Sequence, residues 1–356
     1  MSKTDRGVKG ALVAVFGAAG HTGRFVVAEL LRRGMAPIAI ARDVTSFASS
    51  GLSSHDVLFR EAFIQRPETL DLALKGAQAV INCAGPFFET AHAVAAAAVR
   101  GGMHYFDVSA EQPSVREMLD TYDVAARDAG VAVIPAMSFY GGFADLLVTA
   151  TLGNWSQADT IDVMIGLDSW HPTRGTRITG EKNTSQRMVV TEGALVPLSL
   201  PRPEKEWTFD GPLGYQAMLE VPFSEIVLIT RHVKTAELHT WLNRAALDDI
   251  HNSTTPAPKP ADETGFSSQR FMVDVVATCD GSTRRIVAQG RDIYGFSAVL
   301  VCEGVERLLK GKISGDGAQP PGTIFEAHEL LSALVPDHLT LEIRQTGSSS
   351  HLTVHG

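Results

Sequence analysis

The sequence predicts an α/β protein with two parts: a doubly wound parallel sheet, followed by an α+β domain with a mainly antiparallel sheet. The first part is indicated by apolar, strand-like runs that alternate with helical patterns up to residue 134. Strands buried on both faces read as continuous apolar runs, as residues 11–16 (ALVAVF) do. This alternation gives right-handed strand–helix–strand units and hence a Rossmann sheet. Beyond residue 143, alternating and β-branched runs predominate and indicate antiparallel pairing.

The elements of the first part are assigned in order from these runs and from the glycines that end helices. Gly34, Gly76 and the Gly101-Gly102 pair each follow a helical pattern, as expected at helix C-termini. Strands are expected at residues 11–16, 37–41, 56–59, 79–83, 104–108 and 131–134, and helices at 23–33, 67–75, 89–100 and 113–129.

The second part opens with a predicted helix at 141–153. Residues 252–264 (NSTTPAPKPADET) mix proline with polar residues, so we expect a surface loop there. Strands are expected at 160–166, 223–229, 269–278, 284–288 and 340–343, and helices at 297–309 and 325–334. These elements suggest a first domain at 8–143, an α+β substrate or oligomerisation domain at 144–296, C-terminal helices at 297–345 that pack back on the first domain, and a flexible tail at 346–356.

Composition restricts the class of protein. The 356 residues carry a formal net charge of −9, which argues against a basic nucleic-acid-binding face. Cys83, Cys279 and Cys302 lie far apart without zinc-like spacing, so we expect no metal site, free thiols and a reducing, cytoplasmic location. The longest small and apolar run, residues 91–99, is too short for a membrane span. No Ser/His/Asp order or zinc-protease motif indicates a hydrolase.

A glycine-rich turn, Gly17-Ala18-Ala19-Gly20-His21-Thr22-Gly23, stands between the first strand and the first helix. Gly17 permits a tight turn, Gly20 lets the backbone approach a pyrophosphate, and Gly23 lets the helix pack close to the strand. The helix N-terminus favours the anion, and Thr22 adds a hydroxyl. An ordinary turn is the alternative, but the flanking strand and helix favour a dinucleotide. We assign Gly17, Ala19, Gly20, His21, Thr22 and Gly23 to its phosphates.

The end of the second predicted strand distinguishes NADP from NAD. NAD enzymes place an acidic residue there for the ribose 2′-hydroxyl. Here Arg42 comes first after the strand and suits a 2′-phosphate, with Arg24 in support. The alternative is that Arg42 is solvated and Asp43 binds the ribose. We predict NADP(H).

Two further loops should reach the cofactor, because they follow parallel strands at the same edge of the sheet. Ala84, Gly85, Pro86 and Phe87 follow the fourth strand, where Gly85 would allow close approach to the nicotinamide ribose. Cys83 is interpreted as a core residue.

Ser109 and Glu111 follow the fifth strand and should face the same crevice. Glu111 could accept a hydrogen bond from the nicotinamide amide or a substrate ammonium, or it could cap the helix that starts near Pro113. Both interpretations remain open.

Candidate catalytic and substrate residues lie further along the chain. Tyr140 follows the sixth strand and could donate a proton, although packing at a domain junction is the alternative. His171 could exchange protons near neutral pH, and Arg174 and Arg177 could bind a carboxylate or phosphate. We expect residues 171–177 to form a loop with a tight bend at Gly175; a solvated loop without function is the alternative.

The chain resembles the saccharopine dehydrogenase-like, or saccharopine reductase-like, NADP-binding oxidoreductases over roughly residues 11–343. The resemblance implies a Rossmann domain, an NADP cofactor and an oxidoreductase activity. Ala62 stands near the place of an acidic residue that often faces the adenine in this family, and Ala110-Glu111 replaces the family's Gly-Glu. The resembling segments are residues 15–23 (VFGAAGHTG), 80–87 (VINCAGPF), 102–111 (GMHYFDVSAE), 172–180 (PTRGTRITG), 290–300 (GRDIYGFSAVL) and 321–334 (PGTIFEAHELLSAL).

The sequence thus predicts an NADP-dependent oxidoreductase that acts on a small-molecule C=O, C=N or C=C bond between two domains. Hydride transfer needs little from a protein beyond positioning and one proton donor, so a strong catalytic motif is not required. A sensor that binds NADP without turnover is the alternative. The acidic charge argues against a peripheral membrane enzyme. We expect no nucleic-acid partner and no integral membrane segment, and a homodimer is left open.

Overall fold

The parallel sheet predicted for the N-terminal part is present. Within residues 10–43 and 57–346, which the computed structural model describes, seven strands pair in the order β15-β6-β5-β4-β1-β2-β3, all parallel. Strand β1 lies between β2 and β4, so the chain reverses its path across the sheet there, which is where such folds bind ligands. The strands are β1 (Leu12–Phe16), β2 (Ala36–Ala41), β3 (Leu58–Glu61), β4 (Ala79–Asn82), β5 (His104–Asp107), β6 (Ala132–Ile134) and β15 (Gly317–Ala318).

Helices cover both faces of this sheet because alternate side chains of each strand point to opposite faces. Val13 and Val15 of β1 belong to a core shared with α2, whereas Ala14 and Phe16 pack with helices of the other face. The first core continues into the second sheet through residues such as Ile161. The helices of the first part are α2 (His21–Arg32), α4 (Pro67–Leu74), α5 (Phe87–Arg100) and α6 (Gln112–Asp128).

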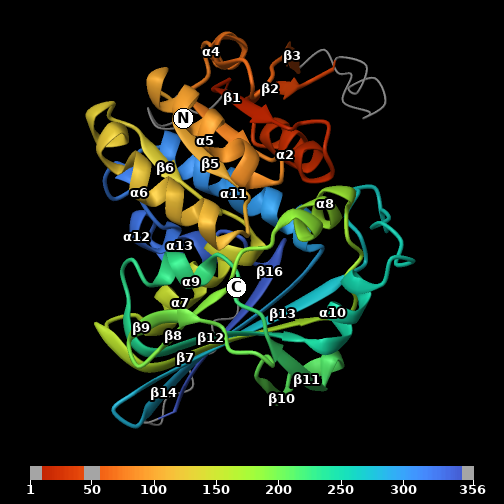
Figure 1. Ribbon diagram of the computed structural model, residues 1–356, viewed down its shortest axis with the longest axis vertical. Helices are drawn as coiled ribbons and strands as arrows, with labels where there is room; N and C mark the ends of the chain where they lie inside the picture. Colours follow the sequence, from red (N-terminus) through yellow and green to blue (C-terminus); the bar gives the residue numbers. More distant parts are fainter. Residues whose placement is uncertain (1–9, 44–56, 347–356) are drawn as a thin grey trace.

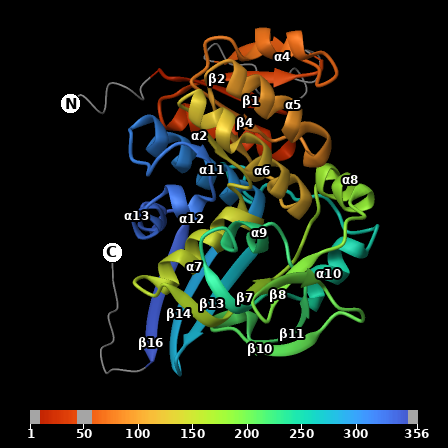
Figure 2. The same cartoon turned by 60° about the vertical axis from the view of Figure 1, so that its left-hand side comes forward.

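The second sheet is mixed and mainly antiparallel. In the described part of the chain it has nine strands, and the pairing of β12 with β7 is its parallel contact. Figures 1 and 2 show this sheet below the parallel sheet, with α7, α9, α12 and α13 between them. The predicted fold class is therefore confirmed. The strands are β7 (Gln157–Leu167), β8 (Met188–Thr191), β9 (Ala194–Pro197), β10 (Glu204–Thr208), β11 (Tyr215–Glu220), β12 (Lys234–Asn243), β13 (Arg270–Cys279), β14 (Ser282–Arg291) and β16 (Leu339–Thr346).

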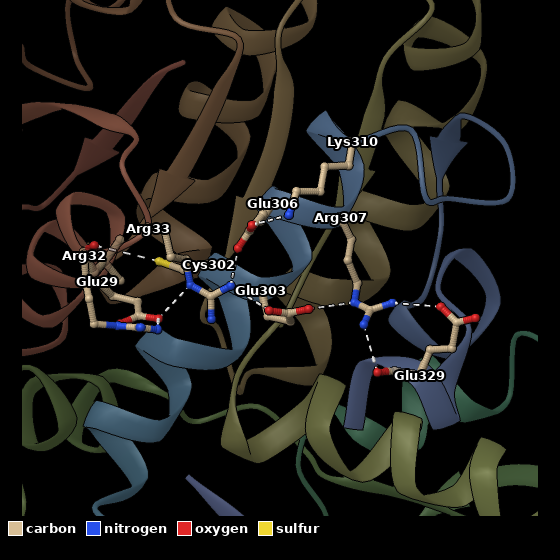
Figure 3. A network of polar contacts seen from close by, with 10 residues as sticks. Glu29, Arg32, Arg33, Cys302, Glu303, Glu306, Arg307, Lys310 and Glu329 are labelled. Atoms are coloured by element: carbon tan, nitrogen blue, oxygen red, sulfur yellow. Dashed lines mark hydrogen bonds and ion pairs between the residues drawn. The ribbon is translucent and has the colours of Figure 1, made fainter. Parts of the chain in front are cut away.

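The remaining helices connect the two sheets. Helix α11 packs against α2, the helix that follows the glycine-rich turn. A buried guanidinium, that of Arg33, joins them through carboxylates of Glu29, Glu303 and Glu306, each at 2.6 Å (Figure 3). These ion pairs fix helix α2 to helix α11, which comes from the C-terminal part of the chain. The helices are α7 (Ala144–Leu152), α8 (Arg174–Lys182), α9 (Glu225–Ile229), α10 (Arg244–His251), α11 (Ile293–Leu309), α12 (Pro321–Ile324) and α13 (Ala327–Ser332).

One predicted element is wrong and another is too long. Residues 223–229, predicted as a strand, contain the helix α9, whose side chains are buried on all sides. An apolar run of this length does not distinguish a buried strand from a buried helix. Of residues 325–334, predicted as one helix, Ala327–Ser332 form the helix α13, and the range begins just after α12 ends. The N-terminal end of the predicted third strand, Asp56, and the tail beyond Thr346 lie outside the described residues.

Candidate cofactor and substrate site

The glycine-rich turn has the geometry that a dinucleotide requires. Gly17 has φ +81°, a left-handed conformation, and its N–H donates to the Ile40 carbonyl of β2 at 3.0 Å. A Cβ on Gly23 would lie 2.2 Å from the Gly17 carbonyl oxygen, so only glycine lets α2 start this close to β1. A Cβ on Gly20 would meet only that same oxygen, at 3.1 Å. The first N–H groups of α2, from His21 to Gly23, lack intrahelical acceptors by position. These features fit a bound pyrophosphate.

Arg42 extends from the end of β2 and is exposed. The hydrogen bond from Gly17 to Ile40 places the turn beside this strand end, so Arg42 is next to the predicted phosphate site. Ala62 after β3 is fully buried, and its N–H donates to the Ala41 carbonyl, while Glu61 just before it is exposed. A basic group without a buried acid at this place favours the 2′-phosphate of NADP.

Replacing Arg42 by alanine is expected to weaken NADPH binding by about 1–3 kcal/mol, with little change for NADH, because one charge-assisted contact is lost. Fluorescence titration of both cofactors measures the ratio. An unchanged NADPH preference in Arg42→Ala would contradict the assignment. Arg24→Ala tests the predicted supporting contact in the same titration.

The loop after β4 is held by Glu111. Its buried carboxylate accepts hydrogen bonds from the backbone N–H of Phe87 and of Ala110, both at 3.0 Å. The carboxylate therefore caps α5 rather than its own helix α6, which receives no side-chain cap. Burial raises the pKa of Glu111. These hydrogen bonds fix the loop after β4, which contains Ala84, Gly85, Pro86 and Phe87, relative to β5. The contact of Glu111 with the nicotinamide stays a prediction.

A buried carboxylate that the sequence reasoning missed organises the next loops. Asp107, at the end of β5, accepts hydrogen bonds from the Ser109 hydroxyl at 2.6 Å, the Ser109 N–H at 3.0 Å and the Ala136 N–H at 2.7 Å. Ser109 is fully buried in this contact. Burial raises the pKa of Asp107. The sequence did contain a signal for Asp107, because an acidic residue at the end of an apolar strand is expected to have hydrogen-bond partners.

Tyr140 lies beyond β6 in a π-helical turn, Phe139–Phe143. Its hydroxyl oxygen is buried and has no hydrogen-bond partner among the described residues. Its ring stacks on Trp170 at 5.1 Å and packs on Phe223 at 4.2 Å. Gly141, at φ +147°, makes this turn possible, since a Cβ there would lie 2.5 Å from the Ser224 hydroxyl oxygen. Burial raises the pKa of Tyr140 well above its usual value, so the hydroxyl stays protonated.

Tyr294, a second tyrosine that the sequence reasoning missed, connects the aromatic rings around Tyr140 to the glycine-rich turn. Trp170 Nε1 donates to the Tyr294 hydroxyl at 3.1 Å, and the Tyr294 ring packs edge-on against His21 at 5.3 Å. The Nε2 atom of His21 is buried without a partner in the described part of the chain, and burial lowers the pKa of His21. Tyr140 and the predicted phosphate site thus share one continuous wall.

The predicted substrate loop is wrong in form. Helix α8 begins at Arg174, and Gly175 lies in its first turn rather than at a bend. The Thr173 hydroxyl accepts from the Thr176 N–H at 3.1 Å and caps the helix, which the sequence reasoning overlooked. At its far end, Lys182 pairs with Glu89 of α5 at 2.8 Å, so α8 spans from the second part of the chain to the first.

The three predicted residues of this segment differ in their surroundings. Arg177 donates to the carbonyl oxygens of Asn252 and Thr255, at 3.1 and 2.8 Å, and so holds the loop after α10. Arg174 is exposed, and His171 is half-buried. Their contact with a substrate stays a prediction.

Arg177→Ala is expected to lower the free energy of unfolding by about 1–2 kcal/mol, because backbone carbonyls of the 252–255 loop lose their donor. The exposed Arg174→Ala should stay within about 0.5 kcal/mol of the wild type. Urea denaturation of both variants measures the difference. Equal stabilities would show that the contacts of Arg177 contribute nothing to the fold.

The described ranges, 10–43 and 57–346, contain no group of three or more His, Cys, Asp or Glu side chains placed to hold a metal ion. None of their helices combines the length and apolar character needed to cross a bilayer.

The fold and the glycine-rich turn define a dinucleotide-binding protein of the Rossmann class. Residues 13–134 match the family model of the saccharopine dehydrogenase NADP binding domain. Over these residues the chain is similar to that domain, and both the predicted resemblance and the predicted cofactor, NADP(H), are confirmed.

The relatives agree with this assignment. A saccharopine dehydrogenase-like oxidoreductase of Rattus norvegicus is 31% identical, covering 39% of this chain and 37% of its own length. A lipid droplet localized protein of Caenorhabditis elegans is 29% identical, covering 38% and 34%. The chain thus spans little more than a third of these curated relatives. Apo saccharopine dehydrogenase (L-Glu forming) of Saccharomyces cerevisiae matches 94% of this chain and 100% of its own, with a TM-score of 0.63 and 12% identity, which shows a shared fold.

Proposed function

We propose that this protein is an NADP-dependent oxidoreductase that transfers hydride to or from a C=O, C=N or C=C bond of a small molecule. The observation that carries the proposal is Tyr140. Its hydroxyl is buried without a partner among the described residues, and it lies in the wall that also contains His21 of the glycine-rich turn. A buried, unsatisfied hydroxyl costs free energy unless a ligand completes it.

The chain's own residues would divide the work as follows. When bound, NADPH supplies the hydride. The turn from Gly17 to Gly23 would hold its pyrophosphate, and Arg42 its 2′-phosphate. Trp170 and Phe223, on either side of the Tyr140 ring, would exclude water. Tyr140 would donate a hydrogen bond from its hydroxyl to the substrate oxygen or nitrogen that gains negative charge, and then its proton.

The test is a screen of NADPH oxidation by the purified protein against carbonyl, imine and enoyl compounds, with cofactor affinity measured in parallel. Turnover of any class with tight NADPH binding supports the proposal. NADPH binding without turnover across all three classes would favour the non-catalytic sensor instead. Absence of NADPH binding would refute both.

We also propose a cytoplasmic location and a small-molecule partner. Cys83, Cys279 and Cys302 are all free thiols, as a reducing compartment allows. Burial raises the pKa of Cys83 and of Cys302, which keeps them as unreactive thiols. One relative is named for lipid droplets, which are therefore the competing location. Fractionation of cells that express the tagged chain decides between the cytoplasm and lipid droplets.

A homodimer is a further proposal, and light scattering of the purified protein tests it.

A further inference from the structure

Arg187 is separated from Tyr140 by one aromatic ring, and it has no role in the hydride transfer proposed for this protein. Arg187 stands between α8 and β8, and its guanidinium lies 4.8 Å from the centre of the Phe223 ring. Phe223 packs in turn on Tyr140. Arg187 therefore forms the end of a stack of a cation and aromatic rings, Arg187–Phe223–Tyr140–Trp170.

The place of Arg187 is fixed against the NADP-binding domain by Gln112, the first residue of α6. The side chain of Gln112 exchanges hydrogen bonds with Met188, accepting at 2.8 Å and donating at 2.9 Å, and donates to the Phe223 carbonyl at 2.9 Å. Because Gln112 follows the loop after β5, Arg187 is held at the carboxyl edge of the parallel sheet. A narrow crevice there is lined by Ala110, Gln112 and Pro113 on one side and by Asn183, Gln186 and Arg187 on the other.

Among the described residues, the hydrogen-bonding capacity around this crevice is only partly used. A guanidinium has five N–H donors. In the described part of the chain, Arg187 uses one, to the Pro222 carbonyl at 2.5 Å. Glu225 is completely buried and engages one carboxylate oxygen with Thr240 and the Phe223 N–H, but its Oε2 has no partner among the described residues.

The electrostatic surroundings keep Arg187 a cation. Burial and the nearby Arg202 lower the pKa of Arg187 to about 10, which still leaves it charged at neutral pH. The nearby carboxylates of Glu225 and Glu111 act in the opposite direction and raise the pKa of Arg187, which favours the charged guanidinium. A partly buried guanidinium with free donors is the group that proteins use to bind planar oxyanions.

We propose that Arg187 is the specificity-determining residue of this site and binds an oxyanion of the substrate, a carboxylate or a phosphate, while Tyr140 meets the reducible bond. This inference rests on the proposed oxidoreductase function. It excludes purely apolar lipid-like compounds as preferred substrates, because an unpaired guanidinium against an alkyl chain would be desolvated without compensation.

The test uses the full chain saturated with NADP⁺ and two probes, oxamate for a carboxylate and inorganic phosphate for a phosphate, by isothermal titration. We expect one of them to bind wild-type protein and to lose at least about 10-fold in affinity in Arg187→Met. The probe that responds identifies the source of the oxyanion. Arg100→Met, which removes an exposed arginine at the C-terminal end of α5, is the matched control and should not change the affinity.

The outcomes separate this inference from the proposed function. NADP⁺ affinity, measured first on every variant, reports the fold and the cofactor site. If NADP⁺ does not bind to the wild type, the proposed function fails. If NADP⁺ binds but neither probe binds, or if Arg187→Met binds both as well as wild type does, the inference is wrong. Where Arg187→Met does not fold, Arg187→Lys replaces it: that variant keeps the charge but loses the planar fork, and it should bind the probe several-fold more weakly.

Discussion

Gly20→Val is expected to lower NADPH affinity by on the order of 100-fold or more while the protein stays folded. In the folded chain a Cβ at this position meets only the Gly17 carbonyl oxygen, at 3.1 Å, so the added methyl groups extend into the space where the backbone approaches the pyrophosphate. Circular dichroism and thermal denaturation check the fold, and fluorescence titration with NADPH checks binding.

Gly23→Ala is the matched control from the same turn. A Cβ there would lie 2.2 Å from the Gly17 carbonyl oxygen and 2.8 Å from the Ala18 Cα, so α2 would have to move away from β1. This variant should lose stability as well as binding, whereas Gly20→Val should lose binding alone. Normal NADPH affinity in a folded Gly20→Val would show that the turn is only structural.

The contrast between these glycines explains why the cofactor half of the site was predictable. The spacing of Gly17, Gly20 and Gly23 and the adjoining strand and helix are local features, and local backbone geometry decides whether an anion fits. The same holds for the seven-stranded sheet, except for β15, whose two residues are too short to give a sequence pattern.

The substrate half depends on contacts between distant parts of the chain. Glu111 was weighed as a cap of the helix next to it, but it caps α5 through Phe87, 24 residues away in sequence. Tyr140, Trp170 and Tyr294 form one wall although they come from three separate segments. Periodicity and spacing contain no information about such pairs.

Of two residues that the sequence analysis missed, one left a signal in the sequence and the other left none. Glu225 is a single carboxylate in an otherwise apolar run, FSEIVLI, and a charge in such a run must find partners inside the protein. Arg187 gave no such signal, because it follows the polar residues 183–186, where an arginine is normally solvated. The role proposed for it rests on contacts of the folded chain, since Gln112 and Phe223 place it at the end of the ring stack that contains Tyr140.

Tyr140→Phe separates a catalytic hydroxyl from a packing residue, because phenylalanine keeps the ring and its contacts with Trp170 and Phe223. With the substrate that the NADPH screen identifies, we expect kcat to fall by about 10²–10⁴-fold, the usual contribution of a positioned proton donor. NADPH affinity should not change, because the hydroxyl is not part of the glycine-rich turn. Stability should be equal or higher, since the variant removes a buried hydroxyl that has no partner in the described structure.

Tyr294→Phe is the control for this last expectation. Its hydroxyl accepts from Trp170 Nε1 at 3.1 Å and contacts the Thr176 hydroxyl at 2.9 Å, so its loss leaves the Nε1 donor of the buried Trp170 unpaired and should cost about 1–3 kcal/mol. Chemical denaturation of both variants and steady-state kinetics of Tyr140→Phe are the measurements. If Tyr140→Phe retains the wild-type kcat, or loses as much stability as Tyr294→Phe does, the Tyr140 hydroxyl serves the fold and the proton comes from another group.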